Sequence, residues 1–248
     1  MVILKSKLLT QFPDVKFGFS TKIGLNREPP FYFNMSMTVK DNKDIVLENR
    51  TAFFNYFGLA YNEAVLQKQA HTDIITYVKK GGQLEESDAL ITDKLNTGLV
   101  ISSADCTPIF IYDKKNKVIA GVHSGWRGTE KKILWKTLNK LFGEFGSLPE
   151  NLFVYIGPSI SQNNYEVGTE VAALFNKKYT RQRGDKFLLD VNRANYDMLI
   201  ESGVPENNIE NSQLCSYDMK NLLHSYRRDG IQSGRALGVI VLKELNAV

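Results

Sequence analysis

The strongest constraint on the fold is a dense series of short apolar runs, each closed by a polar residue, a glycine or a proline. Runs of roughly four to eight residues that are rich in Val, Ile, Leu and Phe are typical of β-strands. Some of them meet across tight connections, and Lys114–Lys117 has the composition of an exposed hairpin turn. The predicted strands are Val15–Thr21, Val65–His71, Ile74–Lys79, Gly98–Ala104, Pro108–Tyr112, Val118–Val122, Leu152–Ile156, Phe187–Val191 and Leu237–Leu242.

Helical periodicity is interspersed among these strands. It is clearest over Glu130–Phe145, where Leu134, Leu138 and Leu141 share one face, and Gly146 predicts the end of that helix. The other predicted helices are Asp44–Phe57, Thr169–Lys178, Ala194–Ser202 and Met219–Arg227. Because helices and strands are mixed and several strands meet through tight turns, the sequence predicts an α+β fold with mixed or antiparallel sheets rather than a regular βαβ winding.

Composition limits the classes of protein that remain. With 43% hydrophobic and 23% charged residues, the chain has the make-up of a globular protein with a sizeable core. The net charge of +4 comes from scattered basic residues, which argues against nucleic-acid binding. No apolar stretch approaches the roughly 20 residues of a membrane span, and the first residues do not have the pattern of a signal peptide.

Domain organisation and compartment follow from the same features. No linker or repeat divides the sequence, so we expect residues 1–248 to form a single domain, with its structured part beginning near residue 15. Two cysteines far apart in sequence do not make a disulfide framework. We therefore expect a cytoplasmic protein with no nucleic-acid or membrane partner, present as a monomer or a weak oligomer.

Three rare residues are the candidates for chemistry. The chain has only three histidines and two cysteines, and His71, Cys106 and His123 each lie at or just after the end of a predicted strand. Strand ends are where a rigid scaffold can direct side chains to one point. Two imidazoles and a thiolate suit Zn²⁺, and three protein ligands leave a fourth position open, as in catalytic zinc sites.

Alternatives remain open for each of these residues. Each histidine could be a packing residue, Cys106 could be a small core residue, and the gaps of 35 residues (71 to 106) and 17 residues (106 to 123) match no compact zinc motif. Copper is an alternative metal, but a blue-copper site would place a methionine soon after the cysteine, and the next one here is Met198. Three histidines are too few for a multicopper centre.

The neighbours of these residues favour chemistry as well. Gly125 and Gly128 flank Arg127 directly after a predicted strand, and glycines there allow a ligand to approach the backbone closely. Arg127 could clamp a carboxylate or phosphate, or form a structural ion pair. Asp105 could orient a histidine or act as an acid or base, with Asp73 as a weaker candidate, or it could simply form a turn.

Several segments resemble the YfiH family, which is described as laccase-like polyphenol oxidoreductases or as purine nucleoside phosphorylases. The resemblance covers most of the chain and runs through segments in the family's order. These segments are FSTKIG, FNMS, QAH, SDALIT, SADCTPIFIYD, VIAGVHSGWRGT, IGPSISQNNYEVGTEV, SYRRDG and GRALGVIVL.

The resemblance implies a single-domain αββα-type sandwich, with mixed β-sheets flanked by helices and with zinc held by His71, Cys106 and His123. It implies phosphorolysis of adenosine, inosine, guanosine and methylthioadenosine, with phosphate as co-substrate, and also adenosine deamination. In deamination the metal would activate a water for attack on the purine, with Asp105 as candidate acid or base. The family fold is also similar to that of a deamidase toxin that uses a cysteine nucleophile.

The chain departs from the family pattern at a few positions. Lys22 stands where the family has an arginine, so a point charge replaces a planar fork. Leu25 replaces a glycine of the same motif, and Ser159 stands where many members have cysteine. His224 falls where the family usually has an aromatic residue, and we interpret it as a packing or surface residue.

Other polar residues are candidates for substrate contacts. Lys22 and Arg127 are candidates for binding an anion. Asn34 and Gln69 could bind base or sugar, or could satisfy backbone groups of loops. The two arginines of SYRRDG, Arg227 and Arg228, could approach an anion or pair with Asp218 and Asp229, and we favour the structural pairs.

Two functions from other classes compete with the zinc enzyme. Cys106 could be a nucleophile with His123 as its base, which would make the protein a metal-free amide hydrolase or deamidase. Alternatively, the chain could be a metal-binding module without activity.

Overall fold

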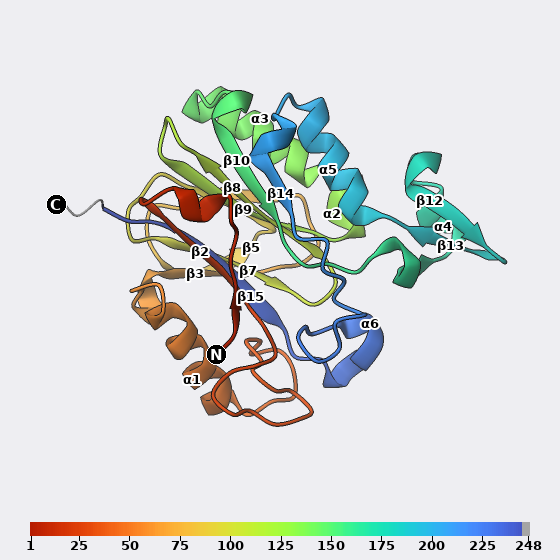
Figure 1. Cartoon of the computed structure of the whole chain (residues 1–248), viewed down its shortest axis with the longest axis horizontal. Helices are drawn as coiled ribbons and strands as arrows, with labels where there is room; N and C mark the ends of the chain where they lie inside the picture. Colours follow the sequence, from red (N-terminus) through yellow and green to blue (C-terminus); the bar gives the residue numbers. More distant parts are fainter. Residues whose placement is uncertain (245–248) are drawn as a thin grey trace.

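Two six-stranded β-sheets packed face to face form the centre of the structure, a computed structural model in which residues 1–244 are described (Figure 1). The first sheet has the order β1 (Ile3–Leu4), β2 (Val15–Ser20), β15 (Ala236–Leu242), β7 (Gly98–Ser103), β3 (Ala64–Lys68) and β5 (Gly82–Glu86). The second has the order β14 (Ile209–Asn211), β10 (Leu152–Ile156), β8 (Thr107–Asp113), β9 (Val118–Ser124), β6 (Ala89–Thr92) and β4 (Ile75–Tyr77). Both sheets contain parallel and antiparallel pairs, which confirms the predicted mixed sheets.

Helices cover the outer faces of both sheets. In Figure 1 the layers run from α1 (Lys43–Asn55) at the bottom, through the sheets, to α3 (Ile133–Phe145) and α5 (Val191–Glu201) at the top. This order is the αββα sandwich that the resemblance implies. The short helices are α2 (Trp126–Glu130), α4 (Thr169–Ala172) and α6 (Tyr226–Asp229), with 3-10 turns at Leu9–Gln11, Tyr61–Glu63, Pro149–Asn151, Gln162–Asn164, Lys177–Tyr179, Glu206–Asn208 and Gly230–Gln232.

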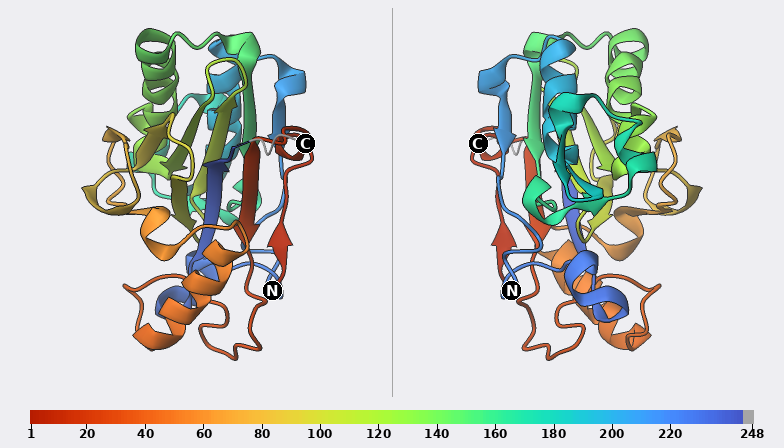
Figure 2. Two further views of the ribbon diagram at one scale, coloured as in Figure 1. Left: turned by 90° about the vertical axis from the view of Figure 1, so that its left-hand side faces the viewer. Right: turned by 90° about the vertical axis from the view of Figure 1, so that its right-hand side faces the viewer.

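A small third sheet projects from the main body beside α4. It has the order β11 (Glu166–Val167), β13 (Lys186–Leu189) and β12 (Thr180–Arg183), and Figure 2 shows it from the side. Its strands β12 and β13 form an antiparallel hairpin, and β11 pairs with β13 on the other side, also antiparallel.

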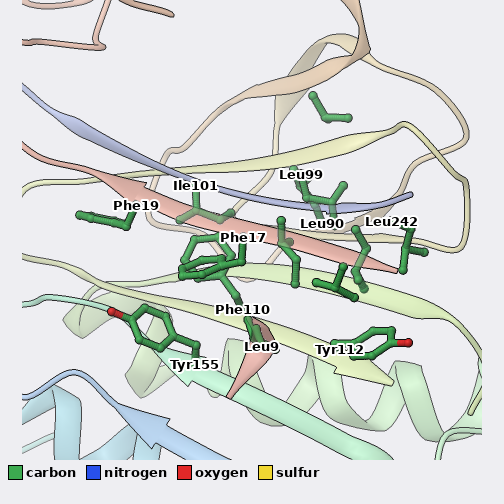
Figure 3. Close-up of a cluster of buried hydrophobic side chains, with 14 of the residues drawn as sticks. Leu9, Phe17, Phe19, Leu90, Leu99, Ile101, Phe110, Tyr112, Tyr155 and Leu242 are labelled. Atoms are coloured by element: carbon green, nitrogen blue, oxygen red, sulfur yellow. The ribbon is translucent and has the colours of Figure 1, made fainter. Parts of the chain in front are cut away.

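Alternating side chains explain the layers, because successive residues of a strand point to opposite faces. In β8, Ile109 and Ile111 pack toward α3, whereas Phe110 and Tyr112 pack between the two sheets. Figure 3 shows Phe110 in that space, next to Phe17 of the first sheet. The ring centres of Phe17 and Phe110 lie 4.9 Å apart. A strand with apolar residues on both faces is buried on both sides, which holds β8 and β9 rigidly at the centre of the molecule.

The hairpin of β8 and β9 determines where the candidate site lies. The two strands are antiparallel neighbours joined by a turn at Lys114–Lys117, as the sequence predicts. Pro108 pairs with His123 at the open end of this hairpin, and Asp113 pairs with Val118 at the turn end. The open end therefore brings Cys106 and His123 onto adjacent strands.

Two predicted helices and one strand end differ in the structure. Met219–Arg227 is not a helix, because Leu223 is buried in the core between the sheets and Ser225 caps a helix, α6, that starts only at Tyr226. The helix predicted over Thr169–Lys178 ends at Ala172. The strand predicted to reach His71 ends at Lys68, since the backbone at His71 takes the left-handed conformation with φ of 59°.

The remaining predicted strands lie within about two residues of those observed. No helix within residues 1–244 is both long and apolar enough to cross a membrane. The single-domain organisation stays a prediction, which one cooperative unfolding transition of the whole chain would support.

Candidate metal centre

Three segments bring the predicted ligands together. His71 lies in the turn after β3, Cys106 directly precedes β8, and His123 is the penultimate residue of β9. Their ligand atoms all lie within 4.8 Å of one another, and Cys106 Sγ lies 3.8 Å from His71 Nε2. His123 is buried, Cys106 is half-buried and His71 is exposed, so the cluster opens to solvent on the His71 side.

Asp88 holds the two histidine segments in place. Its carboxylate is fully buried and accepts a 2.7 Å hydrogen bond from His123 Nδ1. The same carboxylate accepts the backbone N–H groups of Ala70, His71 and Thr72, and the Thr72 hydroxyl at 2.8 Å. Because Nδ1 of His123 is engaged by Asp88, Nε2 is the ring nitrogen available to a metal, the arrangement found around many metal-bound histidines.

The electrostatics of the cluster favour a deprotonated sulfur. Burial acts to raise the pKa of the Cys106 thiol, but His123 and His71 outweigh it and lower that pKa to about 6. Burial acts to lower the pKa of His123, whereas the charges of Cys106 and Asp88 raise it to about 9. For Asp88, burial is outweighed by hydrogen bonds from His123 and Thr72, which lower its pKa to about 2. The thiolate is the form of cysteine that binds metals and attacks electrophiles.

The space among these donors fits a metal ion. Ligands about 2.0–2.3 Å from a tetrahedral Zn²⁺ lie roughly 3.5 Å from one another, close to the observed separation of Sγ and Nε2. Gly125 keeps this space clear, because a Cβ there would come within 2.8 Å of Cys106 Sγ and 3.1 Å of His71 Cδ2. The φ of Gly125 is −75°, which any residue adopts, so close approach alone accounts for this glycine.

A buried polar network fixes the turn that carries Gly125. The hydroxyls of Ser124 and Thr129 lie 2.8 Å apart, and both bond to the side chain of Asn195 in α5. Thr129 also donates to the carbonyl of Gly125. These groups are all buried and mutually satisfied, so they stabilise one conformation of the segment after His123.

Asp105 lies beside Cys106 in a strained backbone conformation, with φ of 109°. Its carboxylate accepts hydrogen bonds from the Ser216 hydroxyl at 2.6 Å and from the backbone N–H of Arg227 at 2.7 Å. Its carbonyl accepts the N–H of Ile160. These contacts connect the backbone next to Cys106 to residues that are distant in the sequence. A role for Asp105 as acid or base stays a prediction.

The two predicted anion-binding residues lie in different surroundings. Arg127, on α2, is exposed, and its guanidinium carbon lies 4.2 Å from the ring centre of Trp126. Lys22 is buried, its Nζ donates to the carbonyl of Lys220, and it lies 4.0 Å from the ring centre of Tyr32. Burial lowers the pKa of Lys22. Arg127 is therefore accessible at the surface, whereas Lys22 supports loops.

Asn34 and Gln69 have their amides engaged by the protein itself. Asn34 is fully buried and bonds to Ser36, Asp41 and the N–H of Arg235. Gln69 pairs with both backbone groups of Ser102, which ties the end of β3 to β7. Their contacts favour the structural alternative that the sequence left open.

The remaining sequence expectations concern His224 and the two arginines of α6. His224 is buried, and within the described residues its Nε2 has no hydrogen-bond partner, which agrees with a packing role. Arg228 forms the expected pair with Asp229 through two nitrogens. Within residues 1–244 the guanidinium of Arg227 pairs with no aspartate, and its Nη1 donates instead to the carbonyl of Glu166.

Sequence reasoning missed the part of Asp88. The residue lies in SDALIT, which carries the family resemblance, but a single aspartate before a strand has no distinctive pattern. Only the tertiary structure shows that five donors converge on it.

Known proteins resemble this chain over most of its length. The family described as multi-copper polyphenol oxidoreductase laccase matches residues 16–243. A protein of Bacteroides thetaiotaomicron named purine nucleoside phosphorylase is 34% identical over 85% of this chain and 84% of its own length. A protein of Clostridium acetobutylicum with the same description is 36% identical over 94% of this chain and 95% of its own length.

Solved structures give the same result. The crystal structure of YfiH from Bacillus licheniformis has a TM-score of 0.88 at 29% identity and covers 92% of this chain and 93% of its own. That of YlmD from Geobacillus stearothermophilus has a TM-score of 0.89 at 26% identity, with coverages of 96% and 94%. The chain therefore belongs to the laccase-like polyphenol oxidoreductase family that includes the YfiH and YlmD proteins.

Proposed function

We propose that this protein is a zinc-dependent enzyme that processes purine nucleosides, chiefly by phosphorolysis. The observation that carries the proposal is the convergence of His71, Cys106 and His123 within 4.8 Å around the space that Gly125 leaves clear. Relatives named purine nucleoside phosphorylase that match most of the chain support the class of substrate. We propose adenosine, inosine, guanosine and methylthioadenosine as substrates, and phosphate as co-substrate.

Zinc suits the donor set better than copper. Two imidazoles and one thiolate on rigid segments form a three-ligand zinc site, and the whole chain has only three histidines, one of them the distant His224. A multicopper oxidase centre needs more imidazoles than this chain contains, despite the laccase description of the family. Bound here, Zn²⁺ would supply Lewis acidity toward an oxygen or nitrogen of the substrate.

The residues of the chain have distinct tasks in phosphorolysis. A phosphate oxygen forms a bond to the anomeric carbon, the bond from that carbon to the purine nitrogen breaks, and the purine leaves with the electron pair and takes up a proton. We assign the anion to Arg127, because it is exposed and lies two residues beyond Gly125. Asp88 fixes the ring of His123, and Asp105 is the candidate source of the proton.

Incubation of the purified protein with adenosine, with and without phosphate, tests this proposal when the products are identified by mass. We expect adenine and ribose 1-phosphate to form only when phosphate is present. Inosine formed without phosphate would identify adenosine deamination, the second reaction that we propose for the same site. If neither reaction occurs with any of the four nucleosides, the proposed function is wrong.

One observation favours a second candidate function, a metal-free amide hydrolase. The structure contains the three groups that such a reaction needs. Cys106 would be the nucleophile, His123 its base, and Asp88 the carboxylate that orients His123. The pKa of the Cys106 thiol is lowered to about 6. In that reaction Sγ would attack an amide carbonyl, the amine would leave with a proton from His123, and water would release the acyl group. Fast alkylation of Cys106 in protein purified without metal would favour this candidate, and stoichiometric zinc with a protected thiol would favour the first.

A further inference from the structure

Two arginines outside the metal-ligand set are held at the corner formed by Asp105 and Cys106. The backbone N–H of Arg227 donates to Asp105 Oδ2 at 2.7 Å. Arg235 precedes Ala236, which pairs with Ser103 in the antiparallel ladder of β15 and β7. Since neighbouring residues of paired strands stay close together, Arg235 lies beside the residues that lead from β7 to Cys106.

Aromatic rings and carbonyl groups fix both guanidinium groups. The guanidinium carbon of Arg227 lies 5.1 Å from the ring centre of Tyr165, and its Nη1 donates to the carbonyl of Glu166 at 2.9 Å. The guanidinium carbon of Arg235 lies 5.0 Å from the ring centre of Tyr226, and its Nη1 donates to carbonyls of Ser233 and Gly234. These contacts orient the two groups but use only part of their five donors each.

Neither positive charge is neutralised by an ion pair. Within residues 1–244, no carboxylate forms an ion pair with Arg227, Arg235 or Arg127. Arg228 shows the contrast, because Asp229 binds it through two hydrogen bonds of 2.7 and 2.8 Å. Arg227 and Arg235 therefore have no direct ion-pair partner, although the Asp105 carboxylate lies at the same corner. Guanidinium groups in this state attract anions.

The charges at this corner also act on the pKa values of Tyr165 and Arg235. Burial raises the pKa of Tyr165, the charges of Cys106 and Asp105 raise it further, and Arg227 and Arg127 lower it. Burial lowers the pKa of Arg235, and the charge of Asp105 counteracts this effect. Tyr165 and the arginines thus lie within electrostatic range of the Cys106 corner.

We propose that Arg227 and Arg235 form the oxyanion subsite next to the metal centre and hold the phosphate that reacts there. This inference rests on the proposed function and deepens it, because it adds these two side chains to Arg127 as groups that bind the anion and leaves out Lys22. Planar guanidinium groups fit the oxygens of phosphate with paired hydrogen bonds, and fixing their orientation beforehand reduces the cost of binding.

Titration of the purified metal-loaded protein with inorganic phosphate, followed by calorimetry, tests the inference without any turnover. We expect Arg227→Gln to weaken phosphate binding by about tenfold or more, because it removes charge-assisted hydrogen bonds. Arg227→Lys should recover part of the affinity, and Arg235→Lys tests the second arginine while its charge is retained. The matched control is Arg181→Gln, which removes an exposed arginine from β12 and should leave phosphate affinity unchanged.

A parallel titration with adenosine 5′-monophosphate distinguishes free phosphate from a phosphate ester. Binding of either anion that depends on Arg227 supports the subsite, even if no nucleoside is turned over. Wild-type affinity for both anions in Arg227→Gln and Arg235→Lys, or no binding of either anion to the wild-type protein, would overturn it. If the wild-type protein turns over nucleosides, an increased KM for phosphate in Arg227→Gln, with an unchanged KM for the nucleoside, gives independent support.

Discussion

The two ends of the hairpin formed by β8 and β9 carry polar clusters of opposite character. At the turn end, the hydroxyl of Tyr112 and the ammonium of Lys117 both donate to Asp14, at 2.7 and 2.6 Å, and Lys117 also donates to the Tyr112 oxygen. At the open end, the ligand atoms of Cys106, His123 and His71 lie within 4.8 Å of one another beside Gly125, which has no side chain.

The difference lies in which groups are satisfied by the protein itself. At the turn end Tyr112, Lys117 and Asp14 bond to one another, and burial together with the hydrogen bond to Asp14 raises the pKa of Tyr112 to about 12. At the open end five donors bond to the Asp88 carboxylate, whereas Cys106 Sγ meets His71 Nε2 at 3.8 Å, a longer and weaker contact. A rigid strand pair thus supports stability at one end and presents unused donor atoms at the other, which is what a binding site requires.

The largest expected effect follows from removing ligands at the open end. We expect Cys106→Ala and His71→Ala each to lower turnover by about a thousandfold or more, because the metal would lose one of three ligands. His123→Ala should abolish turnover as well, but it leaves the Asp88 carboxylate unpaired and should also lower the melting temperature. Lys117→Met at the turn end should leave turnover within about twofold, and steady-state rates compare the four variants. Wild-type activity in either His71→Ala or Cys106→Ala would contradict the account.

Asp88→Asn tests the group that orients the open end. An amide nitrogen facing Nδ1 of His123 would place the proton on Nε2, so we expect metal affinity to fall by about 10- to 100-fold. Competition with a chromophoric chelator measures this affinity. Asp14→Asn is the matched control, for which we expect lower stability with unchanged metal affinity, and an equal loss in both variants would remove the contrast between the two ends.

Gly125→Ala sharpens the comparison by filling the space rather than removing a ligand. Overpacking of this kind costs about 1–3 kcal/mol, so metal affinity should fall by roughly tenfold as Cys106 and His71 are pushed apart. In Gly143→Ala, by contrast, the new Cβ meets no atom within 4 Å and lies within α3, so stability should increase by up to about 1 kcal/mol. Metal affinity of Gly125→Ala equal to that of the wild type would show that the space is not used.

We expect His224 to make the folding stability depend on pH, independently of both ends of the hairpin. Burial, followed by the charge of Lys22, lowers the pKa of His224 from 6.5 to about 3 in the folded protein. The unfolded chain therefore takes up a proton first as the pH falls, so stability is complete above about pH 6.5 and is lost as the pH decreases toward 3.

Lowering the pH from 7 to 5 should decrease the free energy of unfolding by about 2 kcal/mol through this histidine. Urea unfolding at both values, compared with His224→Phe, isolates its contribution, because other titrating groups are common to both proteins. An identical pH response in the two proteins would show that His224 is protonated in the folded state.

Tyr112→Phe gives the smallest expected effect and tests the turn end alone. Loss of one buried hydrogen bond to Asp14 should cost about 1 kcal/mol in denaturant unfolding. Turnover should be unchanged, because the cluster lies at the far end of the hairpin. A large loss of activity would mean that the two ends are coupled and that the comparison fails.

The sequence was informative where residue type and local pattern decide the structure. Leu152–Ile156 is predicted with its exact bounds because an apolar run ends at Gly157-Pro158, and the three ligands stand out because histidine and cysteine are rare in this chain. The αββα order, in contrast, came from the family resemblance, since strand patterns do not specify which strands become neighbours.

Contacts between distant segments explain what the sequence did not predict. Met219–Arg227 has helical periodicity, but the buried Leu223 and the bond from Lys22 to the carbonyl of Leu222 hold it in turns. Asp88 and Arg227 are common residue types whose partners lie far away in sequence. Their contributions become visible only when the partners are in place.

Reconstitution with metal tests the central claim most directly. Nucleoside turnover should be measured on the protein as purified, after complete removal of metal by a chelator, and after titration of Zn²⁺ back into the chelated protein. We predict that phosphorolysis disappears with the metal and returns in full at one equivalent of zinc per chain. Full activity of the metal-free protein, abolished by alkylation of Cys106, would contradict the account and identify the cysteine as the nucleophile.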